Sequence, residues 1–299
     1  MDVAITGASG LIGSALARSL RQDGHRVVPV SRSPGGGDAL AWDPGAGTID
    51  AGGFEGLDAV VHLAGEPIAS GPWTPARRRR IHDSRQQSTR LLATTLAELN
   101  DRPDVLVSGS AVGAYGDRGA EVLTEASTLG HDFLAEVCRD WEAATAPASE
   151  AGVRVAHVRT GIVLDADGGA LAKQLPVFKL GLGGRAGTGT QWMSWITLAD
   201  EVAALRFILD HHLEGPVNLT APAPVTNATF TRALGDALHR PTVVTIPRPV
   251  RSVPFGVGDL VDSLLFTSAR VEPRQLHEAG FSFAHPDLAT ALSAVLAGR

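Results

Sequence analysis

The sequence predicts an α/β fold: a doubly wound parallel sheet joined to a small α+β C-terminal domain. The chain begins with an apolar run, Val3-Ala4-Ile5, followed by a glycine-rich turn and a helix-spaced segment from Ser14 to Arg21. Further apolar runs, typical of buried parallel strands, alternate with helical segments up to about residue 165. The 299 residues, 44% of them apolar, suffice for one large domain or two closely joined ones.

The turn after the first strand reads Thr6-Gly7-Ala8-Ser9-Gly10-Leu11-Ile12-Gly13. Glycine at position 7 permits a turn that a side chain would block. Glycine at position 10 lets backbone N–H groups approach a pyrophosphate, and glycine at position 13 lets the helix pack close to the sheet. The positive end of the helix dipole then faces the phosphates. We predict a nucleotide site with contacts from Gly7, Ser9, Gly10, Leu11 and Ile12; the alternative is an ordinary glycine-rich loop.

The second predicted strand, Val27 to Val30, ends at Ser31-Arg32-Ser33. In a fold that binds NAD, an acidic residue near this point accepts a hydrogen bond from the ribose 2′-OH. Here the residue is Arg32, whose planar guanidinium suits a 2′-phosphate, and hydroxyls flank it. This favours NADP as the cofactor over NAD; the alternative is a solvated loop arginine.

The third long apolar run, Asp58 to Gly65, ends in small residues where the backbone can pass beside a cofactor. His62 lies within this strand, so we interpret it as a core histidine rather than a base. A helix begins at Thr74-Pro75, and its four arginines, Arg77 to Arg80, are interpreted as a solvated face. Arg85 lies further along this helix, where it can face inward.

The next strands are Val105 to Val107, which leads into Ser108-Gly109-Ser110, and Val153 to Val158. The predicted division gives residues 1–165 and about 195–220 to the nucleotide-binding domain. Residues 166–194 and 221–299 then form the C-terminal domain. We expect a helix that Asp200 caps or begins and that runs to His211. Trp192 and Trp195 either line a pocket or fill the core between the two parts.

Composition excludes several classes of function. A net charge of −6 gives no general attraction to nucleic acid or to an anionic membrane. Cys138 is the single cysteine, and the adjacent His211 and His212 cannot form an i, i+4 metal pair, so we expect no metal site. We find no signal peptide and no apolar run of roughly 18 residues. We expect a cytoplasmic monomer or homodimer that acts on a small molecule, with no nucleic-acid or membrane partner.

Taken together, the motifs resemble an atypical, epimerase-like family of extended short-chain dehydrogenases/reductases. Members carry names such as nucleoside-diphosphate-sugar epimerase or cell-division-inhibitor-like protein. The resemblance covers essentially the whole chain and rests on these stretches: the glycine turn, Ser31-Arg32, His62 to Glu66, Ser84-Arg85, Ser110 to Gly116, Trp141-Glu142, Gln191 to Ile196 and Ala279 to Phe283.

The resemblance implies a Rossmann domain that binds NADP beneath a smaller C-terminal domain. It places Ser31 and Arg32 at the 2′-phosphate, Leu63, Ala64 and Gly65 along the adenosine and diphosphate, and Arg85 and Ser108 near the cofactor. It places Ile162 near the nicotinamide. It also makes Ser110 the serine of the family's Ser, Tyr and Lys set, in which the tyrosine exchanges a proton with the substrate hydroxyl.

The sequence departs from the family at the tyrosine and the lysine. About 23 residues after Ser110, where Tyr-x-x-x-Lys is expected, it has Phe133 and Val137. Phenylalanine has no proton to give, and valine cannot lower a pKa. Tyr115, the only tyrosine, is the best substitute acid, with Glu136 and His62 as weaker ones; equally, Tyr115 packs in the core. Two functions stay open: an NADP-dependent oxidoreductase or epimerase with a non-standard acid, and an inactive NADP(H)-sensing protein.

Overall fold

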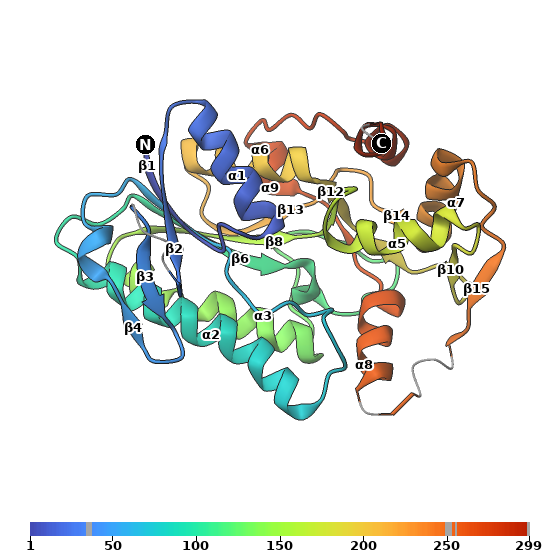
Figure 1. Cartoon of the computed structure of the whole chain (residues 1–299), viewed down its shortest axis with the longest axis horizontal. Helices are drawn as coiled ribbons and strands as arrows, with labels where there is room; N and C mark the ends of the chain where they lie inside the picture. Colours follow the sequence, from blue (N-terminus) through green and yellow to red (C-terminus); the bar gives the residue numbers. More distant parts are fainter. Residues whose placement is uncertain (34–37, 249–252, 255, 298–299) are drawn as a thin grey trace.

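The computed structural model describes residues 1–33, 38–248, 253–254 and 256–297. Its centre is an eight-stranded sheet in the order β13-β8-β6-β5-β1-β2-β3-β4 (Figure 1). Every pairing in this sheet is parallel except that of β3 with β4. In that order the strands are Gly215–Leu219, Arg154–Thr160, Val105–Ala111, Ala59–His62, Asp2–Thr6, Arg26–Ser31, Leu40–Asp43 and Thr48–Ile49. The predicted fold class is confirmed.

Helices cover both faces of the sheet, as Figure 1 shows. One face packs against α1 (Leu11–Gln22) and α6 (Leu198–Asp210), and the other against α2 (Pro75–Glu98) and α4 (Ala146–Glu150). Successive side chains of β1 point to opposite faces of the sheet, so Val3 and Ile5 face α1 and Ala4 faces α2. A third helix on the α2 side, α3 (Phe133–Ala143), packs along α2.

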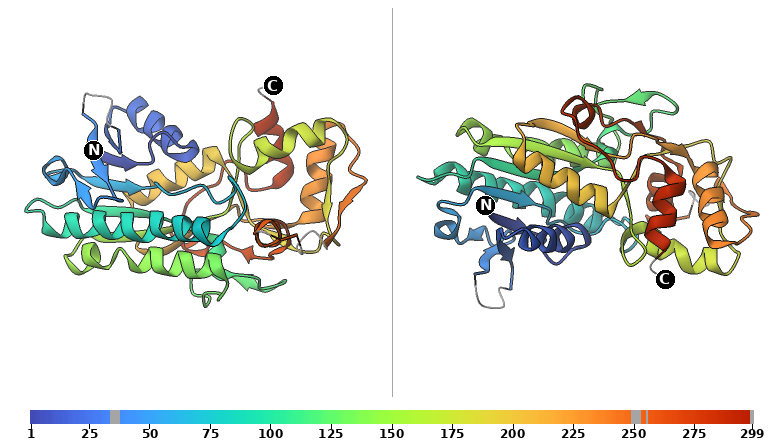
Figure 2. Two further views of the ribbon diagram at one scale, coloured as in Figure 1. Left: turned by 60° about the horizontal axis from the view of Figure 1, so that its bottom comes forward. Right: turned by 90° about the horizontal axis from the view of Figure 1, so that it is seen from above.

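The remaining elements build the C-terminal part, seen at the right of Figure 1 and from two further sides in Figure 2. Its helices are α5 (Gly169–Lys179), α7 (Asn227–Leu238), α8 (Val257–Val261) and α10 (Leu288–Leu296). Helix α9 (Arg274–Glu278) lies instead beside β13 of the large sheet. Its strand pairs are β9 (Ile162–Leu164) with β12 (Trp195–Thr197), β10 (Gly184–Ala186) with β15 (Val244–Ile246), β11 (Trp192–Met193) with β14 (Val225–Thr226), and β7 (Val122–Leu123) with β16 (Arg270–Val271).

Trp195 is fully buried in the apolar cluster of this part, and its indole Nε1 donates to the Ala223 carbonyl, so it fills a core. The predicted helix start at Asp200 is wrong: α6 begins two residues earlier, at Leu198, because the Thr197 hydroxyl caps it by accepting the Asp200 N–H. The Asp200 carboxylate instead accepts the N–H groups of Ala284 and His285. The division into two domains stays a prediction.

Within the described residues, no helix is both long and apolar enough to cross a membrane. His211 and His212 lie beyond the end of α6 rather than on it. No group of three His, Cys, Asp or Glu residues in the described part of the chain is arranged to hold a metal ion.

Candidate functional site

The glycine turn forms a cradle at the carboxyl edge of the sheet. Gly7 has a φ of +69°, and a Cβ there would lie 2.9 Å from the Ala64 nitrogen. A Cβ on Gly13 would lie 2.3 Å from the Gly7 carbonyl oxygen. Gly10 caps α1 without any side-chain hydrogen bond to its first turn. The backbone N–H groups of that turn therefore face outward beside exposed Ser9, an arrangement that fits a pyrophosphate.

Buried hydroxyls hold the neighbouring strand end against this turn. The Thr6 Oγ1 accepts hydrogen bonds from the backbone N–H groups of Leu63 (3.1 Å) and Ala64 (3.2 Å). Its own proton then points to His62 Nδ1, 2.7 Å away, which leaves Nε2–H of His62 to face Thr89 Oγ1 at 2.9 Å. Burial, with a smaller effect from Arg85, lowers the pKa of His62 to about 3. His62 is a neutral core residue, as predicted, and not a base.

Ser31 and Arg32 end β2 at the same edge. The Ser31 hydroxyl accepts a hydrogen bond from the Ser33 N–H, and Arg32 is exposed. Within the described part of the chain, the Arg32 guanidinium forms no hydrogen bond or ion pair with another residue. An exposed guanidinium with no partner among the described residues has the charge and geometry to pair with a phosphate group.

Arg85 faces inward, toward the end of β5. A Cβ on Gly65 would lie 3.2 Å from the Arg85 Cζ. One nitrogen, Nη1, donates to the carbonyls of Glu66 and Ile81, and the guanidinium stacks 5.0 Å from the Trp141 ring centroid. The Nε and Nη2 nitrogens have no hydrogen-bond partner among the described residues. Arg85 thus brings a half-buried positive charge to the middle of the edge.

Ser110 belongs to a buried polar network that joins three elements. Its hydroxyl donates to Glu142 Oε1 (2.6 Å), on α3, and Glu142 forms a bidentate ion pair with Arg159 at the end of β8, at 2.8 Å for both bonds. Burial works to raise the pKa of Glu142, but hydrogen bonds and charge from Arg159 outweigh it and hold this pKa below its ordinary value. Glu142 is therefore a carboxylate with one oxygen on the Ser110 hydroxyl.

Tyr115 joins the same network from the far side of Arg159. The Arg159 Nη1 donates to the Tyr115 hydroxyl (3.1 Å), which itself donates to Asn218 Oδ1 (2.7 Å). The side chain is fully buried, and burial raises the pKa of Tyr115 against the opposing charge of Arg159. These contacts favour the packing interpretation of Tyr115 over its use as an acid.

The positions of the missing tyrosine and lysine are used for packing. Phe133 lies edge-on to Trp73, with ring centroids 5.2 Å apart, and beneath the Arg78 guanidinium. Val137 is buried in the same cluster, and Glu136 points to solvent.

The interpretation of the arginine run as a solvated face holds for Arg79 and Arg80. It is wrong for Arg77, which is buried because it pairs with Glu66 and holds the 66–70 loop.

Three other residues predicted to contact the cofactor, Ser108, Ile162 and Leu11, offer no unpaired polar group at the carboxyl edge of the sheet. Ser108 is fully buried within β6, and the Ile162 N–H already donates to the Ser194 carbonyl (2.8 Å). The Leu11 side chain lies over Gly168 at the start of α5.

The network partners Glu142 and Arg159 were not singled out as site residues from the sequence. The signal was present in Arg159, a charge at the end of an apolar strand.

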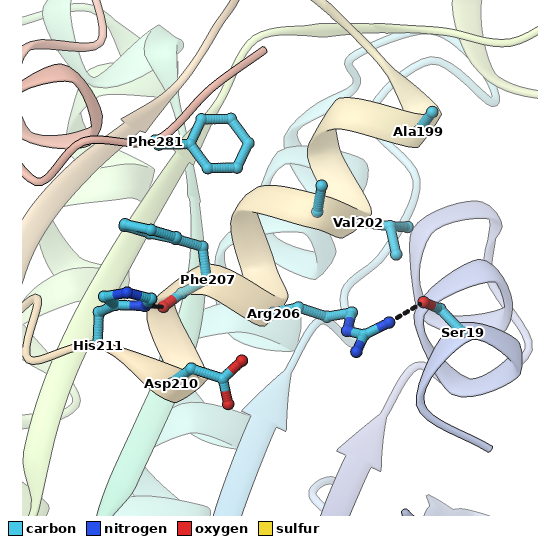
Figure 3. A pocket seen from close by; sticks show the side chains of 9 residues that line it. Ser19, Ala199, Val202, Arg206, Phe207, Asp210, His211 and Phe281 are labelled. Atoms are coloured by element: carbon cyan, nitrogen blue, oxygen red, sulfur yellow. Dashed lines mark hydrogen bonds between the residues drawn. The ribbon is translucent and has the colours of Figure 1, made fainter. Parts of the chain in front are cut away.

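A separate cavity of about 350 Å³ lies between α1 and α6 (Figure 3). Arg206 reaches across it to the Ser19 hydroxyl (2.8 Å), and Phe207 stacks on His211. Ser19 and His211 lie toward the ends of α1 and α6 that are remote from the glycine turn. This cavity is therefore not the nucleotide cradle.

Comparison with known proteins shows the family of this chain. A model described as the NAD dependent epimerase/dehydratase family matches residues 3–136, and a domain of unknown function (DUF1731) matches residues 252–295. Epimerase family protein Mb2239 of Mycobacterium bovis is 44% identical over 292 residues, covering 97% of this chain and 96% of that protein. Human epimerase family protein SDR39U1 is 34% identical over 301 residues, covering 99% of this chain and 100% of that protein.

A crystal structure of the human SDR39U1 protein (isoform 2) with NADPH covers all of both chains, with a TM-score of 0.90 and 32% identity. Identity above 30% over nearly the whole length, together with the same fold, leaves no other family to consider. The chain belongs to the SDR39U1-like epimerase family of extended short-chain dehydrogenases/reductases.

Proposed function

We propose that this chain binds NADP(H) along the carboxyl edge of its sheet and acts as an oxidoreductase or epimerase-like enzyme on a small carbonyl compound or nucleotide sugar. The observation that carries the proposal is the meeting, at one edge, of the glycine cradle and the Ser110–Glu142 hydrogen bond. The NADPH in the human relative supports this choice of cofactor.

The cradle residues Gly7, Gly10 and Gly13 would hold the pyrophosphate, Arg32 the 2′-phosphate, and Arg85 the middle of the cofactor. When bound, the nicotinamide supplies or accepts hydride. Ser110 is the residue we assign to the substrate oxygen. In the direction of alcohol oxidation, the substrate hydroxyl proton passes to Ser110 Oγ as the Ser110 proton passes to Glu142 Oε1. The reverse transfers accompany carbonyl reduction.

The lowered pKa of Glu142 makes this carboxylate a weak base, so the proposed relay is less effective than a tyrosine activated by a lysine. We therefore expect slow turnover.

Arg32→Asp tests the cofactor assignment. Removing the guanidinium and adding a carboxylate opposite the 2′-phosphate is expected to weaken NADPH binding by about 100-fold, since charge-assisted pairs contribute roughly 1.5–3 kcal/mol. NADH affinity should change little. Isothermal titration calorimetry with both nucleotides measures the two losses, and Arg79→Asp, an exposed arginine on α2, is the matched control. An equal loss for NADPH and NADH would contradict the assignment.

Ser110→Ala tests whether Ser110 exchanges a proton with the substrate oxygen. With NADPH deuterated at the nicotinamide C4, the wild-type protein should transfer deuterium to its substrate in a panel of carbonyl compounds and nucleotide sugars. Ser110→Ala is expected to lower this rate by roughly 100-fold or more while the NADPH Kd stays within about twofold. If Tyr115 serves only to pack the core, Tyr115→Phe should retain the wild-type rate of deuterium transfer. A Ser110→Ala variant with the full wild-type rate would remove Ser110 from the mechanism.

A second function is favoured by the packing of Phe133 and Val137 and by the engagement of the Tyr115 hydroxyl with Asn218. In this alternative, the chain binds NADP(H) and turns nothing over. Tight NADPH binding with no deuterium transfer across the whole panel would select it. One substrate with a saturable rate would remove it.

A further inference from the structure

Positive charge and exposed apolar side chains gather at one end of the C-terminal part. Two stretches of the sequence, 168–199 and 237–258, contain no Asp or Glu, although the chain has 32 acidic residues in all. The only two lysines of the chain, Lys173 and Lys179, lie in the first stretch. The expectation of no membrane partner rested on the net charge of −6, and this total hides the local excess of cations.

The fold brings these two stretches together. Strand β10 pairs with β15, with Gly184 opposite Val244. The Arg240 Nε donates to the Lys179 carbonyl at 2.8 Å, and a Cβ on Gly181 would lie 3.6 Å from the Pro241 ring. Figures 1 and 2 show α5, β10 and β15 together at the end of the molecule that is opposite β3 and β4.

Five apolar side chains protrude at this end, which we call the apolar tip. They are Val177 (48% exposed), Leu180 (74%), Leu182 (58%), Val243 (84%) and Val244 (37%). The Leu182 N–H donates to the Val177 carbonyl (3.1 Å), so the members on α5 and its following turn are neighbours. Exposed apolar side chains that gather in one place mark an interaction surface.

Four exposed cations lie on the same segments as the apolar tip: Lys173, Lys179, Arg185 and Arg240. None of the four forms an ion pair with a carboxylate of the described residues. Exposed apolar side chains with unpaired cations on the same segments are complementary to a surface that is anionic outside and apolar beneath.

The composition of the tip argues against other occupants. A second copy docked about a two-fold axis would bring like cations against one another. Nucleic acid would leave the exposed leucines and valines without an apolar partner, and neither residues 169–189 nor 239–248 expose a Phe, Tyr or Trp side chain for base stacking. Strands β10 and β15 lie near one end of the long axis in Figures 1 and 2, where an extended planar surface can approach.

We propose that the apolar tip and its four cations bind the surface of an anionic phospholipid bilayer, with the leucine and valine side chains entering the headgroup region. The chain then lies on the membrane without crossing it. This inference does not depend on the cofactor or on turnover.

Sedimentation with lipid vesicles tests the proposal. The full chain should sediment with vesicles of phosphatidylcholine and phosphatidylglycerol at low salt, should not sediment with phosphatidylcholine alone, and should be released by high salt. Leu180→Asp combined with Leu182→Asp is expected to weaken binding at least about tenfold. Lys179→Ala is expected to weaken it about fivefold.

Matched controls lie elsewhere on the surface. Val122→Asp changes an exposed valine on β7, and Arg79→Ala removes an exposed arginine on α2, so both should bind vesicles as the wild type does. Melting temperatures check that each variant is folded. Failure of the wild type to sediment at low salt would overturn the proposal, and so would equal binding by the wild type and the leucine variant.

Two further outcomes would assign the tip to another occupant and overturn the proposal. A dimer in size-exclusion chromatography that is lost in the leucine variant, without vesicle binding, would assign it to a second copy. Binding to heparin that is lost in Lys179→Ala but kept in the leucine variant, again without vesicle binding, would assign it to a soluble polyanion.

Discussion

Replacing Arg159 with methionine is expected to destabilise the fold by about 3–5 kcal/mol, the usual cost of removing one partner of a buried ion pair. The reason is the network: Glu142 would keep its charge in a buried place with only the Ser110 hydroxyl to pair with, and Tyr115 would lose a donor. Urea unfolding of the wild-type and variant proteins measures the difference.

A double variant distinguishes the lost pair from a packing defect. Glu142→Leu together with Arg159→Met leaves no unpaired charge, so it should regain much of the stability that Arg159→Met alone loses. Arg274→Met is the control, because it removes an exposed i, i+4 pair with Glu278 and should cost under about 1 kcal/mol. A loss below about 1 kcal/mol for Arg159→Met would show that the buried pair contributes little to stability.

The free energy of unfolding should also fall by about 2 kcal/mol between pH 6.5 and pH 8 because of Glu201. This side chain is fully buried in the first turn of α6, with Oε1 accepting from the Thr160 hydroxyl (2.8 Å) and Oε2 without a hydrogen-bond partner in the described part of the chain. Burial raises the pKa of Glu201 to about 8. The folded protein therefore keeps a proton that the unfolded chain, with a pKa near 4.3, releases.

The sign follows from proton binding. Above pH 4.3 the unfolded state holds fewer protons than the folded state, so stability falls as pH rises, by roughly 1.4 kcal/mol per unit, until Glu201 ionises near pH 8. Buried His62 acts in the opposite direction. Its folded pKa of about 3 removes stability as pH falls below 6.5. Burial lowers the pKa of His82, but hydrogen bonds to Asp140 and Asp83 outweigh it and hold this pKa above its ordinary value, so His82 also removes stability as pH rises above 6.5. The difference between the wild type and Glu201→Gln therefore isolates Glu201.

Glu201→Gln tests this assignment, because glutamine keeps the shape without a charge. The free energy of unfolding of the variant should fall by about 2 kcal/mol less than that of the wild type between pH 6.5 and pH 8, as measured by urea titrations at four pH values. Glu136→Gln, an exposed change on α3, should follow the wild type. Parallel curves for Glu201→Gln and the wild type would place the pH dependence elsewhere.

The sequence alone determined the sheet and the cradle. Strand and helix periodicity, and glycines at 7, 10 and 13, are local properties, because a turn with positive φ or a close approach of backbones excludes side chains wherever it occurs. The core position of His62 also followed locally, since a residue inside an apolar strand of a parallel sheet is covered on both faces.

Only the tertiary structure decided which polar groups meet. Ser110 and Tyr115 are five residues apart, yet they are joined through Glu142 and Arg159, because α3 and β8 pack beside the end of β6. Arg77 and Arg79 are two positions apart on α2, so they point to different sides of the helix, and Arg77 is buried while Arg79 is exposed. Sequence spacing does not report such contacts, because side-chain partners are set by packing between elements that are distant along the chain.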